Sequence, residues 1–179
     1  MSAAANVFFD TEFSGLAVAR PQLISLALVS EDGRELYLEL DGVDPAACSP
    51  FVRECVLPLL DGNPVSRESA ALAVRDYLRS FGTRVNLWTD GADYDLALLS
   101  SLTAGTPIPL LRVCRPEFGS VACQSAYERA LGLAYADGPL RRHHALGDAK
   151  ALRAAWIAAR KVAPRQIHAA IARAPHPKA

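Results

Sequence analysis

The feature that most constrains the fold lies near the N-terminus, where the apolar run Val7-Phe8-Phe9 leads into Asp10-Thr11-Glu12. Such a run predicts a buried strand. Because strand side chains alternate between two faces, Asp10 and Glu12 should project on the same side, about 7 Å apart. Two ionised carboxylates this close repel each other unless a cation lies between them or one binds a proton. Their oxygens suit Mg²⁺ or Mn²⁺, although an exposed turn with two acids on its rim would show the same pattern.

Two further strands are expected soon after this segment. Residues Leu23 to Ser30 form a largely apolar run, and Glu35 to Leu40 alternate between apolar and polar residues. The Asp32-Gly33 pair between them is typical of a hairpin turn. The three segments together predict an antiparallel meander.

Helices and short strands alternate along the rest of the chain. Caps and apolar periodicity predict helices at residues 50–57, 67–81, 93–102, 120–131 and 146–162, and a weaker one at 165–173. Short strands are expected at residues 85–89 and 110–113, with a loop at 133–142. A three-stranded antiparallel meander followed by such alternation predicts an α/β fold, a mixed sheet with parallel strands added and helices on its faces. No glycine-rich phosphate loop of the Walker or Rossmann type follows a strand, which argues against a nucleotide-cofactor domain.

Length and composition favour a single globular domain. The 179 residues predict one domain over residues 1–174 and a short tail at 175–179. No apolar run approaches the roughly 20 residues that span a bilayer, and no basic segment precedes an apolar one as in a signal peptide. The four cysteines lack zinc-site spacing, so buried reduced thiols in a cytoplasmic protein are the expectation, with a disulfide pair or metal site as the alternative.

The zero net charge conceals a strong asymmetry. Residues 1–140 hold ten arginines against eighteen acidic residues, a net charge of −8. Residues 141–179 hold nine lysines and arginines against one acid, Asp148, a net charge of +8. A cationic segment beside an acidic body would suit a ligand with a phosphate backbone bound next to metal ions. Equally, a basic helix face could complement the acidic surface of its own protein.

A second acidic cluster follows the strand expected at 85–89. Asp90, Asp93 and Asp95 lie within six residues at the start of a helix. Acids are favoured in a first helical turn, so capping or a solvated turn would account for Asp90 and Asp93. Asp95 lies between Tyr94 and Leu96, which predicts buried surroundings and makes it the stronger candidate for a site.

A third cluster combines histidine with an acid, in the run His143-His144-Ala145-Leu146-Gly147-Asp148. A lone buried histidine is more often structural than catalytic. Its combination with a strand D-x-E and a helix-opening aspartate favours two-metal phosphodiester hydrolysis, in which several carboxylates hold two divalent ions about 3.5–4 Å apart. A histidine with an ordinary pKa can accept the proton of a metal-bound water at neutral pH.

In this order and spacing, Asp10-x-Glu12, Asp95 and His143-x-Ala145-x-x-Asp148-Ala149 resemble the DEDDh 3′–5′ exonucleases of the RNase H-like superfamily. That family includes oligoribonuclease, ribonuclease T and the proofreading subunit of bacterial DNA polymerase. The last block is matched in full, whereas the usual D-x-E-T-T-G opening has Phe13 and Ser14 in place of the two threonines. The resemblance covers residues 7 to about 162 and, with the D-T-E-F opening, is greatest to a stand-alone exoribonuclease branch.

The resemblance implies an RNase H-like fold and a role for each matched residue. Two Mg²⁺ or Mn²⁺ ions would be held by four acids, Asp10, Glu12, Asp95 and Asp148, with Asp93 replacing Asp95 if the register differs. His143 would be the general base, and His144 is the second choice. The pocket for the 3′-terminal nucleotide would be lined by Phe13, Ser14, Gly15, Leu16 and Tyr94. The substrate backbone would contact basic residues around the last motif, namely Arg141, Arg142, Lys150 and Arg153.

The expected function is therefore metal-dependent 3′–5′ hydrolysis of single-stranded RNA or short oligonucleotides, with little base preference because stacking tolerates every base. RNA is favoured over DNA, many relatives are dimers, and a homodimer is possible. Three alternatives stay open. They are a DNA-directed exonuclease, a non-catalytic nucleic-acid-binding module on the same fold, and an unrelated α/β protein whose aspartates are helix caps.

Overall fold

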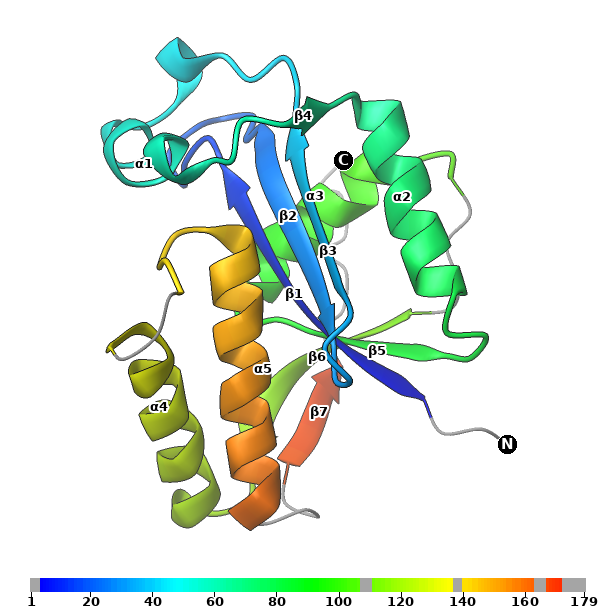
Figure 1. The fold of residues 1–179 in the computed structure, drawn as a ribbon, viewed down its shortest axis with the longest axis vertical. Coiled ribbons are helices and arrows are strands. Elements are labelled where there is room, and N and C mark those ends of the chain that lie inside the picture. Colours follow the sequence, from blue (N-terminus) through cyan, green and yellow to red (C-terminus); the bar gives the residue numbers. More distant parts are fainter. Residues whose placement is uncertain (1–3, 107–110, 137–139, 163–166, 172–179) are drawn as a thin grey trace.

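The predicted meander forms one half of a seven-stranded mixed sheet in the computed structural model, which describes residues 4–106, 111–136, 140–162 and 167–171 (Figure 1). Strand β1 (Ala5–Phe13) pairs antiparallel with β2 (Leu23–Ser30), and β2 pairs antiparallel with β3 (Glu35–Leu40). The short strand β4 (Pro64–Val65) adds to β3 in parallel. The hydrophobic pattern and the Asp-Gly turn therefore predicted these three long strands correctly.

The other half of the sheet continues from β1. Strand β5 (Val85–Trp88) lies parallel to β1, and β6 (Leu111–Phe118) lies parallel to β5. Strand β7 (Ile167–Ile171) closes this side by pairing antiparallel with β6. The order β4-β3-β2-β1-β5-β6-β7 leaves β1, with its two acids, in the middle of the sheet.

Helices cover both faces of this sheet. Helices α2 (Arg67–Arg79) and α3 (Ala92–Leu102) pack on one face, and α4 (Val121–Ala136) and α5 (Ala145–Val162) pack on the other (Figure 1). The alternation of β1 assigns its residues to these layers. Val7 and Phe9 join the core under α2 and α3, whereas the ring of Phe8 meets that of Trp156 on α5 at 5.4 Å.

A short helical segment covers the end of the sheet at which β1 finishes. It contains the single turns η1 (Pro45–Ala47) and η2 (Leu57–Leu59) around α1 (Pro50–Cys55) (Figure 1). Ser49 caps α1 by accepting the Val52 amide, and a proline occupies the first helical position, as the sequence predicted. This segment borders the carboxyl end of β1, where the acidic residues lie.

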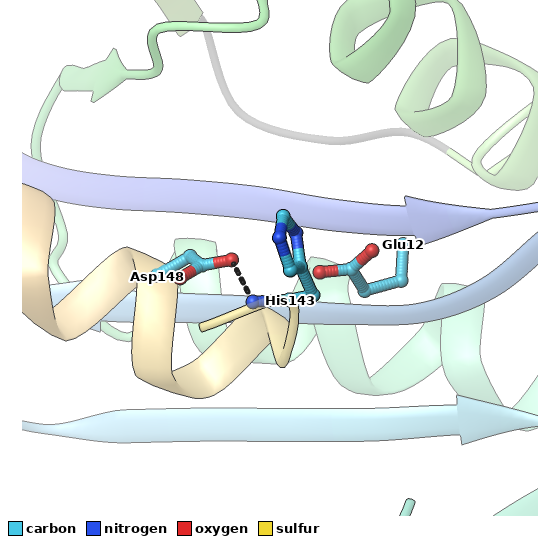
Figure 2. Close-up of side chains that lie close together, drawn as sticks. All are labelled: Glu12, His143 and Asp148. Carbon is cyan, nitrogen blue, oxygen red and sulfur yellow. Dashed lines mark hydrogen bonds between the residues drawn. The ribbon is translucent and has the colours of Figure 1, made fainter. Parts of the chain in front are cut away.

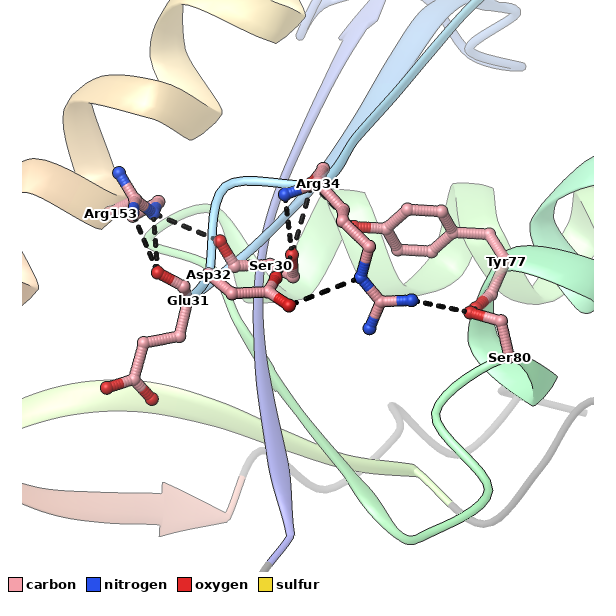
Figure 3. A network of polar contacts seen from close by, with 7 residues as sticks. All are labelled: Ser30, Glu31, Asp32, Arg34, Tyr77, Ser80 and Arg153. Carbon is pink, nitrogen blue, oxygen red and sulfur yellow. Dashed lines mark hydrogen bonds and ion pairs between the residues drawn. The ribbon is translucent and has the colours of Figure 1, made fainter.

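The turn between β2 and β3 ties the helices of both faces to the sheet. Arg153 of α5 donates to the carbonyl oxygens of Ser30 and Glu31, and Tyr77 of α2 donates its hydroxyl to the Arg34 carbonyl at 2.8 Å (Figure 3). These bonds add to the hairpin's own backbone hydrogen bonds at the Ser30 and Arg34 carbonyls and give donors to the Glu31 carbonyl. They also hold α5, which carries the last motif, in a fixed position along β1 and β2.

Two predicted elements were wrong. The weak helix expected at 165–173 is replaced by β7, because pairing with the edge of β6 outweighs a weak local helix preference. The loop expected at 133–142 begins later, since α4 continues through Gly132 to Ala136 and brings Tyr135 to α5. The strand expected at 110–113 also extends further, to Phe118. The tail predicted at 175–179 lies outside the described residues.

The burial expected for the cysteines is found at three of the four positions. No disulfide joins the four cysteines, and Cys48, Cys114 and Cys123 are buried. Among the described residues, no helix combines the length and the apolar character that a membrane span needs.

Candidate active site

The two acids of β1 lie on one face of the sheet, as their spacing predicted. Asp10 pairs in register with Ala27 and Glu12 with Ser25, so both project toward the face that α5 covers. Burial raises the pKa of Glu12 to about 8, helped by the negative charges of Asp148 and Asp95. Burial also raises the pKa of Asp10, reinforced by Asp95, Asp148 and Glu12. This pair therefore resists ionisation until positive charge is brought to it.

One oxygen of Asp10 is suited to bind a cation. Its Oδ2 atom is buried and accepts no hydrogen bond from the described residues. Buried carboxylate oxygens are almost always hydrogen-bonded, because leaving one unpaired costs on the order of 1–3 kcal/mol, and more when the group is charged. An ion bound to this oxygen would remove that cost.

Asp95 reaches the same place from the first turn of α3. Its side chain is 3% exposed, and its Oδ1 accepts the Thr11 hydroxyl at 2.5 Å while Oδ2 accepts that of Thr89. Burial raises the pKa of Asp95 to about 6, although the two threonine hydroxyls favour its charged form. The prediction of buried surroundings for Asp95 is confirmed. No sequence signal identified the two threonines that orient it.

Asp148 enters the site from the first turn of α5. Its Oδ1 accepts the Tyr135 hydroxyl at 2.6 Å, and its Oδ2 accepts the backbone N–H of His143 at 3.0 Å (Figure 2). Burial raises the pKa of Asp148, whereas these two donors act in the opposite direction. Tyr135 lay in a predicted loop, so the sequence did not indicate this contact.

His143 projects between Glu12 and Asp148 (Figure 2). One ligand atom from each of Glu12, His143 and Asp148 lies within 4.8 Å of the other two, and the imidazole stands between the two acidic side chains (Figure 2). His143 has a φ of 63°, a left-handed conformation that non-glycine residues seldom adopt. The edge of the Phe51 ring meets the imidazole at 4.9 Å, so α1 supports the ring from outside.

The second-choice histidine lies elsewhere. His144 is 5% exposed, stacks on Tyr37 of β3 at 4.6 Å, and approaches the Arg141 guanidinium at 3.3 Å. Burial and the charge of Arg141 lower the pKa of His144. Of the two histidines, His143 is therefore the one that faces the acids.

Asp90 is a fifth acid at the site, although its position in the sequence suggested a helix cap or a solvated turn. Asp10, Asp90 and Asp95 offer one carboxylate oxygen each within 4.8 Å of one another. Helix α3 receives no side-chain cap, so Asp90 does not cap it. Asp93, the alternative to Asp95, is exposed in the same helical turn.

Two residues of each ligand group, His143 with Asp148 and Asp10 with Asp90, line one cavity of about 200 Å³. Its lining includes Asp10, Asp90, Tyr135, Arg142, His143 and Asp148. The Arg142 guanidinium lies 5.7 Å from the centre of the Tyr135 ring. The cavity therefore combines carboxylates, an imidazole and one exposed cation, which suits a divalent metal with a phosphate.

The residues predicted to line a nucleotide pocket divide into two kinds. Phe13 and Tyr94 stack at 5.2 Å, Tyr94 is 42% exposed and Leu16 is 70% exposed, so apolar surface is available beside the acids. Ser14 is fully buried, and its hydroxyl accepts the Gln22 amide at 2.9 Å. Gly15 has a φ of 132°, and a Cβ there would lie 2.8 Å from Cβ of Ser49. Ser14 and Gly15 thus shape the turn that follows β1.

Most of the basic residues around the last motif contact the protein itself. Arg141 pairs with Asp61 at 3.1 Å, Lys150 pairs with Glu35 at 2.8 Å, and Arg153 donates to backbone carbonyls of the β2–β3 turn (Figure 3). Arg160 pairs with Glu31 at 2.6 Å. For these four residues, the basic C-terminal face complements the acidic body. Arg142 alone among the four predicted backbone contacts lines the cavity.

Comparison with known proteins agrees with this geometry. Two proteins named 3′–5′ exoribonuclease, from two strains of Mycobacterium tuberculosis, are each 36% identical to the chain over 102 residues. The matched segment is 53% of this chain and 59% of each relative, so the chain spans little more than half the length of these relatives. No protein-family model matches the chain.

The fold also resembles that of a solved nuclease. The zinc-bound complex of Escherichia coli ExoI with single-stranded DNA matches 92% of this chain and 42% of its own, with a TM-score of 0.60 and 12% identity. The predicted RNase H-like fold is confirmed by this likeness. Together, the relatives and the fold support the resemblance to 3′–5′ exonucleases that the motifs indicated.

Proposed function

We propose that this chain is a metal-dependent 3′–5′ exonuclease that hydrolyses single-stranded RNA or short oligonucleotides with two divalent ions and His143 as general base. One observation carries the proposal. Asp10 of β1, Asp90 of the turn before α3 and Asp148 of α5, of which the first and last are 138 residues apart, line one cavity together with His143. Acids that only cap helices act locally and need not lie close to one another, so their convergence argues against the unrelated α/β alternative.

The donor set fits divalent metal ions. All the converging ligands except the imidazole are carboxylates, the oxygen donors that Mg²⁺ and Mn²⁺ prefer. The unpaired Oδ2 of Asp10 and the raised pKa values of Asp10 and Glu12 both fit carboxylates that a divalent cation would stabilise in their charged form. Two groups of ligands suggest two ions: Asp10, Asp90 and Asp95 would hold one, and Glu12 with Asp148 would hold the other.

Bound divalent ions supply charge stabilisation at the phosphate and lower the pKa of water. The chain's own residues do the rest. The imidazole of His143, which lies between Glu12 and Asp148 (Figure 2) and is free of the buried packing that holds His144, accepts the proton of the attacking water. Its left-handed backbone donates its N–H to Asp148, which fixes the position of the base relative to that ligand.

The substrate class follows from the surface beside the acids. The stacked rings of Phe13 and Tyr94 offer an aromatic platform for a terminal base, which any base can use. Arg142 offers a cation for the phosphate. The relatives named exoribonucleases favour RNA, and the ExoI complex favours a single strand, while a DNA-directed enzyme stays the main alternative.

Digestion of 5′-labelled single-stranded RNA, with matched DNA alongside, tests the proposal. Reactions contain Mg²⁺, Mn²⁺ or EDTA. Asp10→Asn and His143→Ala remove a ligand and the base. Asp95→Asn is matched by Asp93→Asn, which removes the same charge from the same helical turn at an exposed position.

We expect a metal-dependent ladder that shortens from the 3′ end, lost in Asp10→Asn, His143→Ala and Asp95→Asn and kept in Asp93→Asn. Loss of activity in Asp93→Asn alone would move the metal ligand to Asp93. If the wild-type protein binds RNA but leaves RNA and DNA intact with every metal, the chain is a binding module and the proposal fails.

A further inference from the structure

The exonuclease site needs cations for the rest of the substrate backbone, and the residues near the last motif do not provide them. Arg141, Lys150 and Arg153 are engaged with the protein's own oxygens. Arg142 serves the cavity at the acids. A single strand longer than its terminal nucleotide would therefore need positive charge from another part of the surface.

Such charge gathers in a second cavity of about 320 Å³, which we call the Arg20–Arg67 cavity. Arg20 and Gln22 precede β2, Arg67 opens α2, and Ser101 lies on α3. Leu23 and Leu98 add apolar surface to the lining. Together with residues 40–43 at the end of β3, these segments form one hollow with several hydrogen-bond donors and an apolar side.

Both arginines are available to a ligand. Arg67 donates one N–H to the Ser101 hydroxyl at 2.7 Å, which holds the guanidinium at the cavity and leaves its other donors unused. Within the described part of the chain, neither Arg20 nor Arg67 forms an ion pair. Asp41 is the acid in the lining, so two positive charges face one negative charge. Two guanidinium groups without carboxylate partners are typical of a site for a phosphate.

The cavity lies next to the proposed aromatic platform. Leu23 of its lining is the registered strand partner of Phe13. Leu98 of its lining follows Tyr94 by one helical turn on α3, so the two side chains share a face. A strand that leaves the metal site across Phe13 and Tyr94 therefore reaches the Arg20–Arg67 cavity next.

We propose that the Arg20–Arg67 cavity binds a backbone phosphate of the nucleotides upstream of the 3′ end, an inference that rests on the proposed exonuclease function. The apolar side of the cavity accommodates the sugar or base of the same nucleotide. The cavity thus sets the preferred substrate length: oligonucleotides long enough to fill it bind more tightly than those that reach only the metal site.

The test compares the double variant Arg20→Gln/Arg67→Gln with Arg79→Gln, a matched control. Arg79 is an exposed arginine at the other end of α2, ~18 Å from Arg67 along the helix axis. Hydrolysis is measured with bis(p-nitrophenyl) phosphate, which has no upstream nucleotide, and with RNA of about two to about twelve nucleotides. Binding of the same RNA to each protein in the Asp10→Asn background is measured by fluorescence anisotropy from about 50 to about 200 mM salt.

We expect the double variant to hydrolyse the small ester like wild type, but to show a KM and a Kd for the longer RNAs about tenfold higher. The slope of log Kd against log salt should fall by about 0.7, the value for one lost phosphate contact on a single strand. Arg79→Gln should change neither quantity. Equal length dependence and equal salt slopes in the double variant and wild type would overturn the inference.

The two proposals fail in different ways. A wild-type protein that hydrolyses neither ester nor RNA refutes the exonuclease, and with it the upstream site as a substrate subsite. Active protein whose double variant binds long RNA normally refutes the cavity assignment and leaves the exonuclease standing.

Discussion

Replacing Glu12 by glutamine should stabilise the metal-free protein at alkaline pH while removing its response to metal. The reason is the cost of ionising a carboxyl that is mostly buried beside other acids. Burial, then the charges of Asp148 and Asp95, raise the pKa of Glu12 from 4.5 to about 8. In the unfolded chain the same carboxyl has its ordinary pKa and meets none of these neighbours.

The sign follows from proton binding. Between about pH 4.5 and about pH 8 the folded protein keeps the Glu12 proton and the unfolded chain releases it, so the free energy of unfolding falls as pH rises. This stability is fully present below about pH 4.5 and is lost as the pH rises through about 8. At ~1.4 kcal/mol for each pH unit, the loss attributable to Glu12 between about pH 5 and about pH 8 is on the order of 3–4 kcal/mol.

Urea unfolding of metal-free protein across this pH range measures the effect. Glu12→Gln keeps the shape of the side chain and removes its charge. We expect it to match wild type at about pH 5 and to exceed it by ~3–4 kcal/mol at about pH 8. Saturating Mg²⁺ should reverse the order, because an ion that binds the folded state stabilises the wild type more than a variant lacking a ligand.

Glu54→Gln on the exposed side of α1 is the control, with no expected change in either experiment. If wild type and Glu12→Gln lose stability in parallel as the pH rises, or if Mg²⁺ stabilises both equally, Glu12 is neither the titrating group nor a ligand. The reasoning from burial would then be wrong.

Three further substitutions test other parts of the site. Tyr135→Phe removes the 2.6 Å hydrogen bond to Asp148 and should therefore raise the pKa of Asp148. The acidic limb of the pH–rate profile should move to higher pH, and kcat should fall about tenfold or more. An unchanged profile would contradict this role of Tyr135. Gly147→Ala would place a Cβ 2.3 Å from a carbonyl oxygen and should cost about 1–3 kcal/mol in urea unfolding, whereas Gly132→Ala, with open space around it, should be neutral or stabilising. Asp90→Asn should weaken Mg²⁺ binding, measured by calorimetry, and an unaltered affinity would return Asp90 to the role of a surface acid.

The sequence alone determined the elements that depend on local pattern. The apolar run before Asp10, the Asp-Gly turn at residue 33 and the cap at Ser49 each specify their structure through neighbours a few residues away. Local pattern also placed the candidate acids, through period-two spacing in β1 and the first turns of α3 and α5, and the resemblance to exonucleases gave them their predicted roles.

Only the tertiary structure decided how distant segments use those residues. It turned residues 167–171 into an edge strand, stacked His144 on Tyr37 away from the acids, and paired Lys150 and Arg153 with oxygens of the protein itself. It also brought Asp90 and Tyr135 to the acids from positions that local pattern assigned to a cap and a loop. Strand pairing, charge pairing and burial depend on partners many residues away, so spacing within a short window of sequence does not encode them.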